Sequence, residues 1–187
     1  PYGLIANNSK HLGGAIDGPA ADKASRFMQL CDAFGLPIVS LCDTPGFMVG
    51  PEAEKTAPVR HGCRMFVTRS SLSVPALVWV LRKGYCLCPM AMVGGGFHES
   101  MATVSWPTGE FGGMGLEGAV RLGFAKELDA TPDEAAKQAL FDKLLAELYE
   151  NGKAISIGSV LEVDAVIDPV ETRSWISGAA RAAGRPA

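Results

Sequence analysis

The residues best suited to chemistry form a short segment in which an apolar run is followed by a basic pair, a glycine and a proline. Residues 78–81 form the apolar run, Arg82 and Lys83 follow it, and Gly84 and Pro89 complete the segment. Proline suits the first position of a helix, because the N–H that it lacks would have no partner there. The segment therefore predicts a strand, a sharp turn and a helix start. The free backbone N–H groups of such a start stabilise negative charge that develops on an oxygen atom.

Side chains that could act as bases, nucleophiles or metal ligands are few. His11, His61 and His98 lie far apart in the sequence, and we interpret them as surface or core residues. The zinc-protease pair of histidines and the G-x-S-x-G nucleophile elbow are both missing. The five cysteines are odd in number and lie mostly in apolar runs, which predicts reduced thiols. Cys86 and Cys88 have no histidine close by in the sequence, so we expect no metal site.

Two motifs resemble nucleotide-binding sites without meeting their requirements. Residues 113–118 match G-x-G-x-x-G, but the acidic residues about twenty positions later open a helix, whereas a dinucleotide site needs a strand end there. Residues 43–46 match the D-x-x-G turn of GTPases, yet the chain has no phosphate-binding loop. We interpret both as tight turns. Arg82 and Lys83 either bind an anion or form the solvated end of a strand.

Strands and helices are predicted to alternate around these turns. Apolar runs favour strands at residues 2–7, 38–42, 75–81, 102–106 and 165–168. Apolar residues at helical spacing favour helices at residues 20–34, 51–68, 116–125, 133–149 and from 169 onward, and a short helix is predicted after Cys88 that ends at the three glycines 94–96. Pro58 falls inside the second of these helices and predicts a kink. The alternation predicts an α/β fold with mainly parallel strands, and the alanine-rich residues 178–187 are predicted to fray.

The composition limits the classes of partner. The chain has 187 residues, of which 48% are hydrophobic, and its net charge is −3. One domain that buries part of its surface against a partner fits these numbers. The charge and the lack of a basic stripe argue against nucleic acid, and no apolar run is long enough to cross a membrane. We expect a cytoplasmic protein. Because the chain opens within a strand-like run, we also expect a fragment or one half of a split protein.

The order of the turns is more specific than any single motif. It consists of Leu-Gly-Gly-Ala-Ile-Asp at 12–17, Asp-Thr-Pro-Gly-Phe at 43–47, Arg-Lys-Gly-Tyr at 82–85, Trp-Pro-Thr-Gly-Glu-Phe-Gly-Gly-Met-Gly at 106–115 and Asp-Ala-Val-Ile-Asp-Pro at 164–169. This succession resembles the C-terminal half of the carboxyltransferase (beta) component of biotin-dependent acyl-CoA carboxylases, of the propionyl-, acetyl- and long-chain types. The resemblance covers nearly the whole chain, and it implies a crotonase-like (ClpP/crotonase) superhelix of βα units.

The resemblance implies that residues 1–187 are the biotin-side domain, without the N-terminal half that binds acyl-CoA. In that family carboxybiotin gives its carboxylate to the α-carbon of acyl-CoA, and two adjacent backbone N–H groups hold the ureido oxygen of the departing biotin. Carried onto this chain, they are the N–H groups of Leu87 and Cys88. Met90 would line the pocket and influence acyl preference. The other substrate-binding residues implied are Gly84, Tyr85, Cys86, Gly46 and Phe47.

The resemblance further implies biotin on a carrier protein or domain as the cofactor, an N-terminal carboxyltransferase half as a partner, and a homo-oligomer of the full protein. The family has small, glycine-rich residues at positions 86–89, where this chain has Cys-Leu-Cys-Pro. Two alternatives stay open. The chain could belong to a biotin-dependent acyl-CoA decarboxylase, or it could be a non-catalytic assembly module of the same fold.

Overall fold

The strands form one parallel sheet in the part of the chain, residues 1–184, that the computed structural model describes. The sheet has the order β1-β2-β3-β4-β6, and β5 pairs with the end of β3. The strands are β1 (Gly3–Ala6), β2 (Ile38–Thr44), β3 (Ala76–Tyr85), β4 (Ala102–Ser105), β5 (Glu110–Gly112) and β6 (Ala165–Val166). The predicted α/β class with parallel strands is confirmed.

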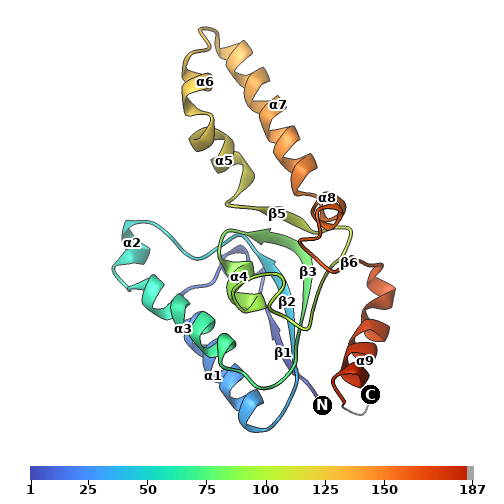
Figure 1. Cartoon of the computed structure of the whole chain (residues 1–187). Helices are drawn as coiled ribbons and strands as arrows, with labels where there is room; N and C mark the ends of the chain where they lie inside the picture. Colours follow the sequence, from blue (N-terminus) through green and yellow to red (C-terminus); the bar gives the residue numbers. More distant parts are fainter. Residues whose placement is uncertain (185–187) are drawn as a thin grey trace.

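Helices cover both faces of the sheet (Figure 1). The helices of the described residues are α1 (Gly18–Ala33), α2 (Pro51–Glu54), α3 (Pro58–Ser70), α4 (Cys88–Val93), α5 (Leu116–Gly123), α6 (Ala125–Asp129), α7 (Glu134–Gly152), α8 (Ala154–Ser159) and α9 (Thr172–Ala182), with 3₁₀ turns η1 (Leu12–Gly14) and η2 (Pro169–Glu171). The larger core joins the sheet to α1, α3 and α4, and a smaller core joins its other face to α9. Within the described residues, no helix combines the length and apolar character that crossing a membrane requires.

The central strand β3 leads directly to the predicted turn. Val78 and Val80 point into the larger core, whereas Leu77 and Trp79 point into the smaller one, and all four are almost completely buried. Burial on both faces explains why this strand is an uninterrupted apolar run rather than an alternating pattern. The carboxyl end of β3 lies at the carboxyl edge of the sheet, beside the ends of β2 and β5.

The helix predicted at residues 51–68 is two helices. Ala57 adopts a left-handed conformation, with φ of 53°, and Pro58 is the first residue of α3. Proline disfavours the helical conformation in the residue before it, so the chain breaks at Ala57 and a new helix starts. The prediction of one helix with a kink at Pro58 is therefore wrong.

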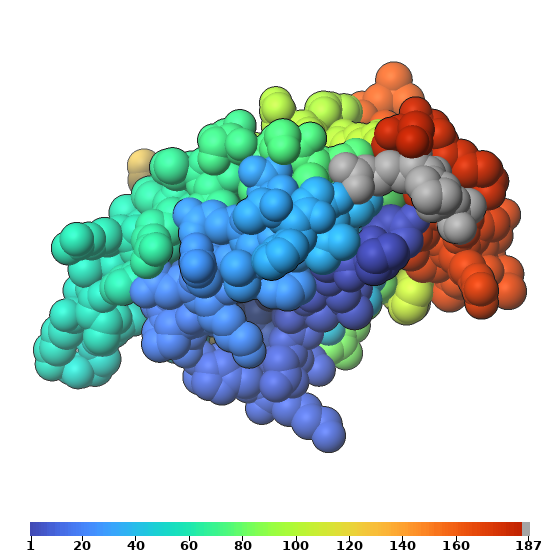
Figure 2. All heavy atoms as spheres, turned by 90° about the horizontal axis from the view of Figure 1, so that it is seen from below, coloured from blue at the N-terminus to red at the C-terminus, as the bar shows by residue number. Residues whose placement is uncertain are grey.

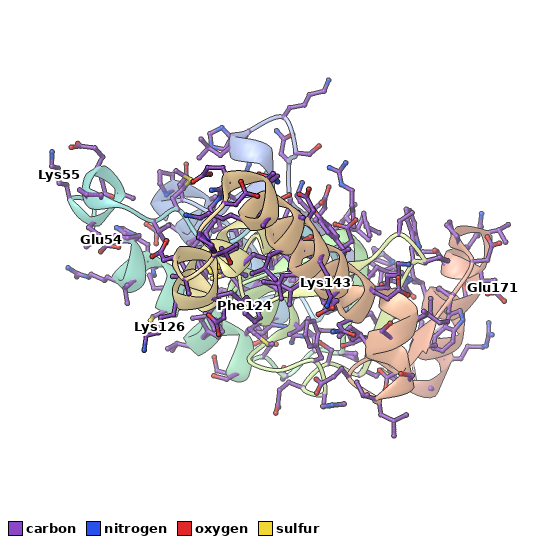
Figure 3. All side chains as sticks on the ribbon, turned by 90° about the horizontal axis from the view of Figure 1, so that it is seen from above. Glu54, Lys55, Phe124, Lys126, Lys143 and Glu171 are labelled. Carbon is purple, nitrogen blue, oxygen red and sulfur yellow. The ribbon has the colours of Figure 1, made fainter. Side chains whose placement is uncertain are left out.

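Three short elements were not predicted from the sequence: β5, α6 and α8. Helices α5 to α7 form an arm that projects from the sheet (Figure 1), and Lys126 and Lys143 lie exposed on it (Figure 3). The helix predicted at 133–149 is present as α7, but only Gly152 among its residues is buried. Helix α9 continues to Ala182, inside the tail predicted to fray, and residues 185–187 lie outside the described part of the chain.

Candidate active site

The predicted turn lies between β3 and α4. Cys86 has a φ of 64°, in the left-handed region, which reverses the chain directly after Tyr85. The N–H of Cys86 donates a hydrogen bond of 3.0 Å to the carbonyl oxygen of Gly112, in β5. Leu87 then caps α4, and Pro89 occupies its first turn. The strand, turn and short helix predicted from the sequence are confirmed.

Two backbone donors of this turn have no acceptor. Within residues 1–184, neither the N–H of Leu87 nor that of Cys88 donates a hydrogen bond, and Pro89 has no N–H to offer. The carbonyl oxygen of Leu87 accepts the Ala91 N–H at 3.0 Å, which closes the first turn of α4. The two residues differ in exposure, since Leu87 is 61% exposed and Cys88 is completely buried. An oxygen atom that approaches the turn therefore meets Leu87 first.

The Asp-Thr-Pro-Gly-Phe turn after β2 packs against the turn after β3. Gly46, with φ of 138°, lies so close to Cys86 that a Cβ atom on the glycine would be 3.2 Å from the Cβ of Cys86. The N–H of Gly46 donates to the Thr44 hydroxyl at 3.2 Å, which tightens the turn. The ring of Phe47 lies instead against Gly62 of α3. The structure thus brings Gly46 and Cys86 together and directs Phe47 toward α3.

The other predicted binding residues support the turn from within. Tyr85 is almost completely buried, and its hydroxyl donates a 2.8 Å hydrogen bond to Glu110 of β5. Burial, together with the Glu110 carboxylate, raises the pKa of Tyr85 well above its usual range. Gly84 is buried between Val80 and β5, and Met90 is half-buried on α4, where it packs against the larger core.

Two buried thiols near the turn, those of Cys88 and Cys42, are not activated. Burial raises the pKa of Cys88 to about 12, and it raises the pKa of Cys42, on the neighbouring strand, even further. Both thiols are therefore protonated near neutral pH, whereas a cysteine nucleophile must be a thiolate. Burial therefore argues against a nucleophilic role for these two thiols.

The basic pair at the end of β3 is held by a carboxylate that the sequence analysis did not identify. Asp43, at the end of β2, lies 3.0 Å from the Arg82 guanidinium and 3.3 Å from the Lys83 ammonium group. The N–H of Lys83 also donates to this carboxylate, at 3.1 Å. Burial acts against ionisation of Asp43, but the two cations outweigh it and hold the pKa of the carboxyl group below its usual value. Only the adjacency of β2 and β3 reveals this cluster.

The histidines and the larger cavity lie elsewhere. His61 Nδ1 is 2.8 Å from Asp22 of α1, and His11 Nε2 is 3.1 Å from Asp17, the N-cap of that helix, so both rings contact carboxylates at α1. A cavity of about 740 Å³ lies between α1 and β1, elements of the face that Figure 2 shows from below. None of the predicted site residues lines it. The candidate site is therefore the turn itself and not this cavity.

Known proteins resemble the chain along nearly its whole length. A family model described as the carboxyl transferase domain matches residues 1–185. The 12S subunit of methylmalonyl-CoA carboxyltransferase from Propionibacterium freudenreichii subsp. shermanii is 37% identical over 179 residues, which are 95% of this chain and 33% of that protein. The alpha subunit of methylmalonyl-CoA decarboxylase from Veillonella parvula is also 37% identical, over 95% of this chain and 33% of that protein.

A solved structure supports the same relationship. The structure of a single-chain, multi-domain long-chain acyl-CoA carboxylase is 57% identical, with a TM-score of 0.83, and the match covers 95% of this chain and 17% of that one. The predicted crotonase-like fold is confirmed by the solved carboxyltransferases that share this architecture. The chain spans about a third of the length of the curated relatives that it matches. Because the carboxyl transferase domain model matches residues 1–185, the chain belongs to the carboxyl transferase domain family.

Proposed function

We propose that this chain is the biotin-side half of an acyl-CoA carboxyltransferase. The observation that carries the proposal is the pair of adjacent N–H groups at Leu87 and Cys88, which have no acceptor in the described residues and stand at the carboxyl edge of a parallel sheet. Ligands of open α/β sheets bind at this edge. The family resemblance gives the ligand as the ureido oxygen of biotin.

The reaction moves a carboxylate from a biotin nitrogen to the α-carbon of an acyl-CoA. As the N–C bond of carboxybiotin breaks, its electron pair stays on the biotin and delocalises onto the ureido oxygen. The biotin nitrogen takes the proton of the α-carbon, and the resulting enolate forms the new C–C bond to the released carboxyl carbon. Two N–H donors aimed at the ureido oxygen lower the barrier, and the loss of one such donor typically costs about 3–4 kcal/mol.

The geometry of the turn sets a condition on binding. Leu87 is exposed, whereas Cys88 is completely buried, and the Cys86 side chain lies against Gly46. The ureido oxygen thus reaches the Leu87 N–H directly, whereas the Cys88 donor lies deeper in the turn. We assign Met90, Tyr85 and the Gly46 turn to the wall of the biotin pocket.

The proposed reaction needs components that this chain does not supply. A biotin carrier protein or domain would bring carboxybiotin, and an N-terminal carboxyltransferase half would bind acyl-CoA opposite the turn. The full protein would form a homo-oligomer in the cytoplasm, where the five free cysteines of the chain stay reduced.

The test is carboxyl transfer from malonyl-CoA or methylmalonyl-CoA to free biotin, with an N-terminal half supplied. We expect biotin-dependent loss of the carboxylated CoA ester. Both halves must first be shown to fold and associate, by circular dichroism and sedimentation. Turnover no faster than the background rate under those conditions would refute the proposed activity.

A decarboxylase role is a second candidate, because one relative is the alpha subunit of methylmalonyl-CoA decarboxylase. The same donors would stabilise the same oxygen when carboxyl transfer runs from acyl-CoA to biotin. Co-purification of the full protein with a membrane decarboxylase would favour this direction. If the Cys86→Gly/Cys88→Gly double variant also shows no transfer in either direction, the chain is instead a non-catalytic assembly module.

A further inference from the structure

Arg69 is a buried cation without an ionic partner in the described residues. It lies in the last turn of α3 and is only 8% exposed. Its Nη2 donates a 3.3 Å hydrogen bond to the hydroxyl of Ser100, and its Nε is buried without any partner. A buried charge that no carboxylate neutralises is unfavourable unless its surroundings provide a negative potential.

The carboxyl end of α4 provides that potential. Gly94, the left-handed cap of α4, lies so close to Arg69 that a Cβ atom on the glycine would be 2.8 Å from Cγ of the arginine. The Ser100 hydroxyl donates in turn to the carbonyl oxygen of Val93, the last residue of α4, at 2.7 Å. Carbonyl groups at the carboxyl end of a helix favour a nearby cation. Arg69 thus connects α3 to this end of α4 through its charge and through one hydroxyl group.

The amino end of the same helix carries the two free donors. Helix α4 has six residues, and hydrogen bonds to its two cap residues close its ends, from the Ala91 N–H to Leu87 O at 3.0 Å and from the Gly94 N–H to Met90 O at 2.9 Å. So short a helix tilts as one body, and a change of angle at Val93 changes the direction of the N–H groups at its start.

We propose that Arg69 is a positioning residue that holds the carboxyl end of α4 and thereby orients the N–H groups of Leu87 and Cys88. The role of these donors toward biotin rests on the proposed function, whereas the coupling of Arg69 to α4 does not. Arg69 touches neither substrate nor reacting atoms and acts only through the helix.

Nuclear magnetic resonance of the ¹⁵N-labelled chain tests the coupling without any assay of activity. Arg69→Met keeps the packing of the alkyl stem and removes the charge and the donors, whereas Arg69→Lys keeps the charge. We expect Arg69→Met to shift the amide signals of Leu87 and Cys88. It should also speed hydrogen exchange of the Ala91 N–H about tenfold, as loss of a charge-assisted hydrogen bond predicts. Arg69→Lys should show both changes to a smaller degree than Arg69→Met, because it keeps the positive charge.

Two further variants sharpen the outcome. Ser100→Ala removes only the hydroxyl that joins Arg69 to Val93, and it should produce the same changes to a smaller degree. This variant replaces Arg69→Met in the test if Arg69→Met does not fold. Arg60→Met, at an exposed position of α3, is the matched control and should leave α4 unchanged. The proposal is overturned if the amide signals and the hydrogen exchange of α4 are unchanged in folded Arg69→Met. If Arg69→Met does not fold, the same result in Ser100→Ala overturns it.

Kinetics separate this proposal from the proposed function. In the assembled carboxyltransferase, Arg69→Met should raise the KM for biotin about tenfold and leave the KM for acyl-CoA unchanged, because only the biotin donors are displaced. If α4 responds as expected but the unaltered protein transfers no carboxylate, then the coupling stands and the proposed function fails. Equal changes in both KM values would show a general structural role and overturn the assignment.

Discussion

At the scale of single residues, backbone conformation defines the candidate site more than side-chain chemistry does. Cys86 adopts a left-handed conformation that L-residues seldom take, and its N–H donates a hydrogen bond to the carbonyl oxygen of Gly112 in β5. Among residues 1–184, the next two N–H groups have no acceptor, and the Cys88 thiol nearby is kept neutral by burial. Preorganised N–H groups need no proton transfer to stabilise a developing oxyanion.

Replacement of Leu87 by proline tests the first donor directly. Leu87 has φ of −81°, which proline tolerates, and its N–H makes no hydrogen bond that the variant would lose. We expect Leu87→Pro to lower the kcat of carboxyl transfer about 10²–10³-fold. Steady-state kinetics with saturating biotin measure this change, and circular dichroism checks that the variant is folded.

Leu87→Ala is the control for that measurement, because it removes the exposed side chain and keeps the N–H. It should retain kcat within about threefold, as an exposed side chain contributes little to the transition state. Equal losses in the two variants would mean that the side chain and not the N–H group matters.

Replacement of Cys86 by glycine tests strain and crowding in the turn. A left-handed L-residue costs about 1–2 kcal/mol, part of which the greater flexibility of glycine offsets. We expect Cys86→Gly to raise the free energy of unfolding by about 0.5–1 kcal/mol. It should also raise carboxyl transfer, since it clears the space beside Gly46. Urea denaturation and transfer kinetics measure the two effects.

Leu161→Gly is the matched control for strain. Leu161 has φ of 63° and is 76% exposed at the end of α8, away from the candidate site. It should give a similar gain in stability without any change in carboxyl transfer. A rise in transfer in both variants would assign the effect of Cys86→Gly to stability alone.

At the scale of elements, the position of β3 depends on hydrogen bonds between α1 and the segment that connects α3 to β3. Asp32, at the end of α1, accepts hydrogen bonds from the Ser73 hydroxyl and N–H, both at 2.8 Å, and from the Val74 N–H at 3.2 Å. These two residues lead from α3 into β3. One carboxylate therefore fixes the entry of the central strand relative to α1.

This junction predicts a pH dependence of stability. The Ser73 hydroxyl and the two N–H groups outweigh burial and hold the pKa of Asp32 below its usual value. Because the folded-state pKa is lower than that of the unfolded chain, which is about 3.9, the stabilisation is complete above that pH and is lost as the pH falls through the folded-state value. Asp32→Asn should therefore be less stable than the unaltered chain at pH 7, and the difference should shrink below about pH 4.

Urea denaturation over a series of pH values measures this prediction. Asp129→Asn changes a largely exposed carboxylate on α6 and serves as the control, with a pH profile like that of the unaltered chain. A constant difference between Asp32→Asn and the unaltered chain from pH 7 to pH 2 would contradict it.

At the scale of the whole molecule, the arm of α5 to α7 exposes apolar surface that the rest of the chain does not cover. Leu122 is 70% exposed on α5, and the leucines of α7 at 140, 144 and 148 are only half-buried. Exposed apolar patches on soluble proteins mark interaction surfaces. The arm of α5 to α7 therefore has a surface suited to association.

We expect the chain to self-associate at micromolar concentration, and we expect Leu122→Glu to weaken the association constant at least about tenfold by removing one buried leucine. Sedimentation equilibrium measures both. Val170→Glu, at an 83% exposed position beside α9, is the control and should leave association unchanged. A strictly monomeric unaltered chain at every concentration would show that the arm does not pair two copies of this chain.

The sequence alone determined the α/β class, the turn after β3 and the family, because apolar periodicity, proline position and the order of turns are local properties of the chain. Its local patterns could not reveal β5 or α8, which are too short to show a periodicity. Only the tertiary structure decided that Asp43 holds the basic pair, that Gly46 abuts Cys86 and that Arg69 supports α4. Each of these contacts joins segments far apart in the sequence, and which segments meet depends on the order of the strands in the sheet.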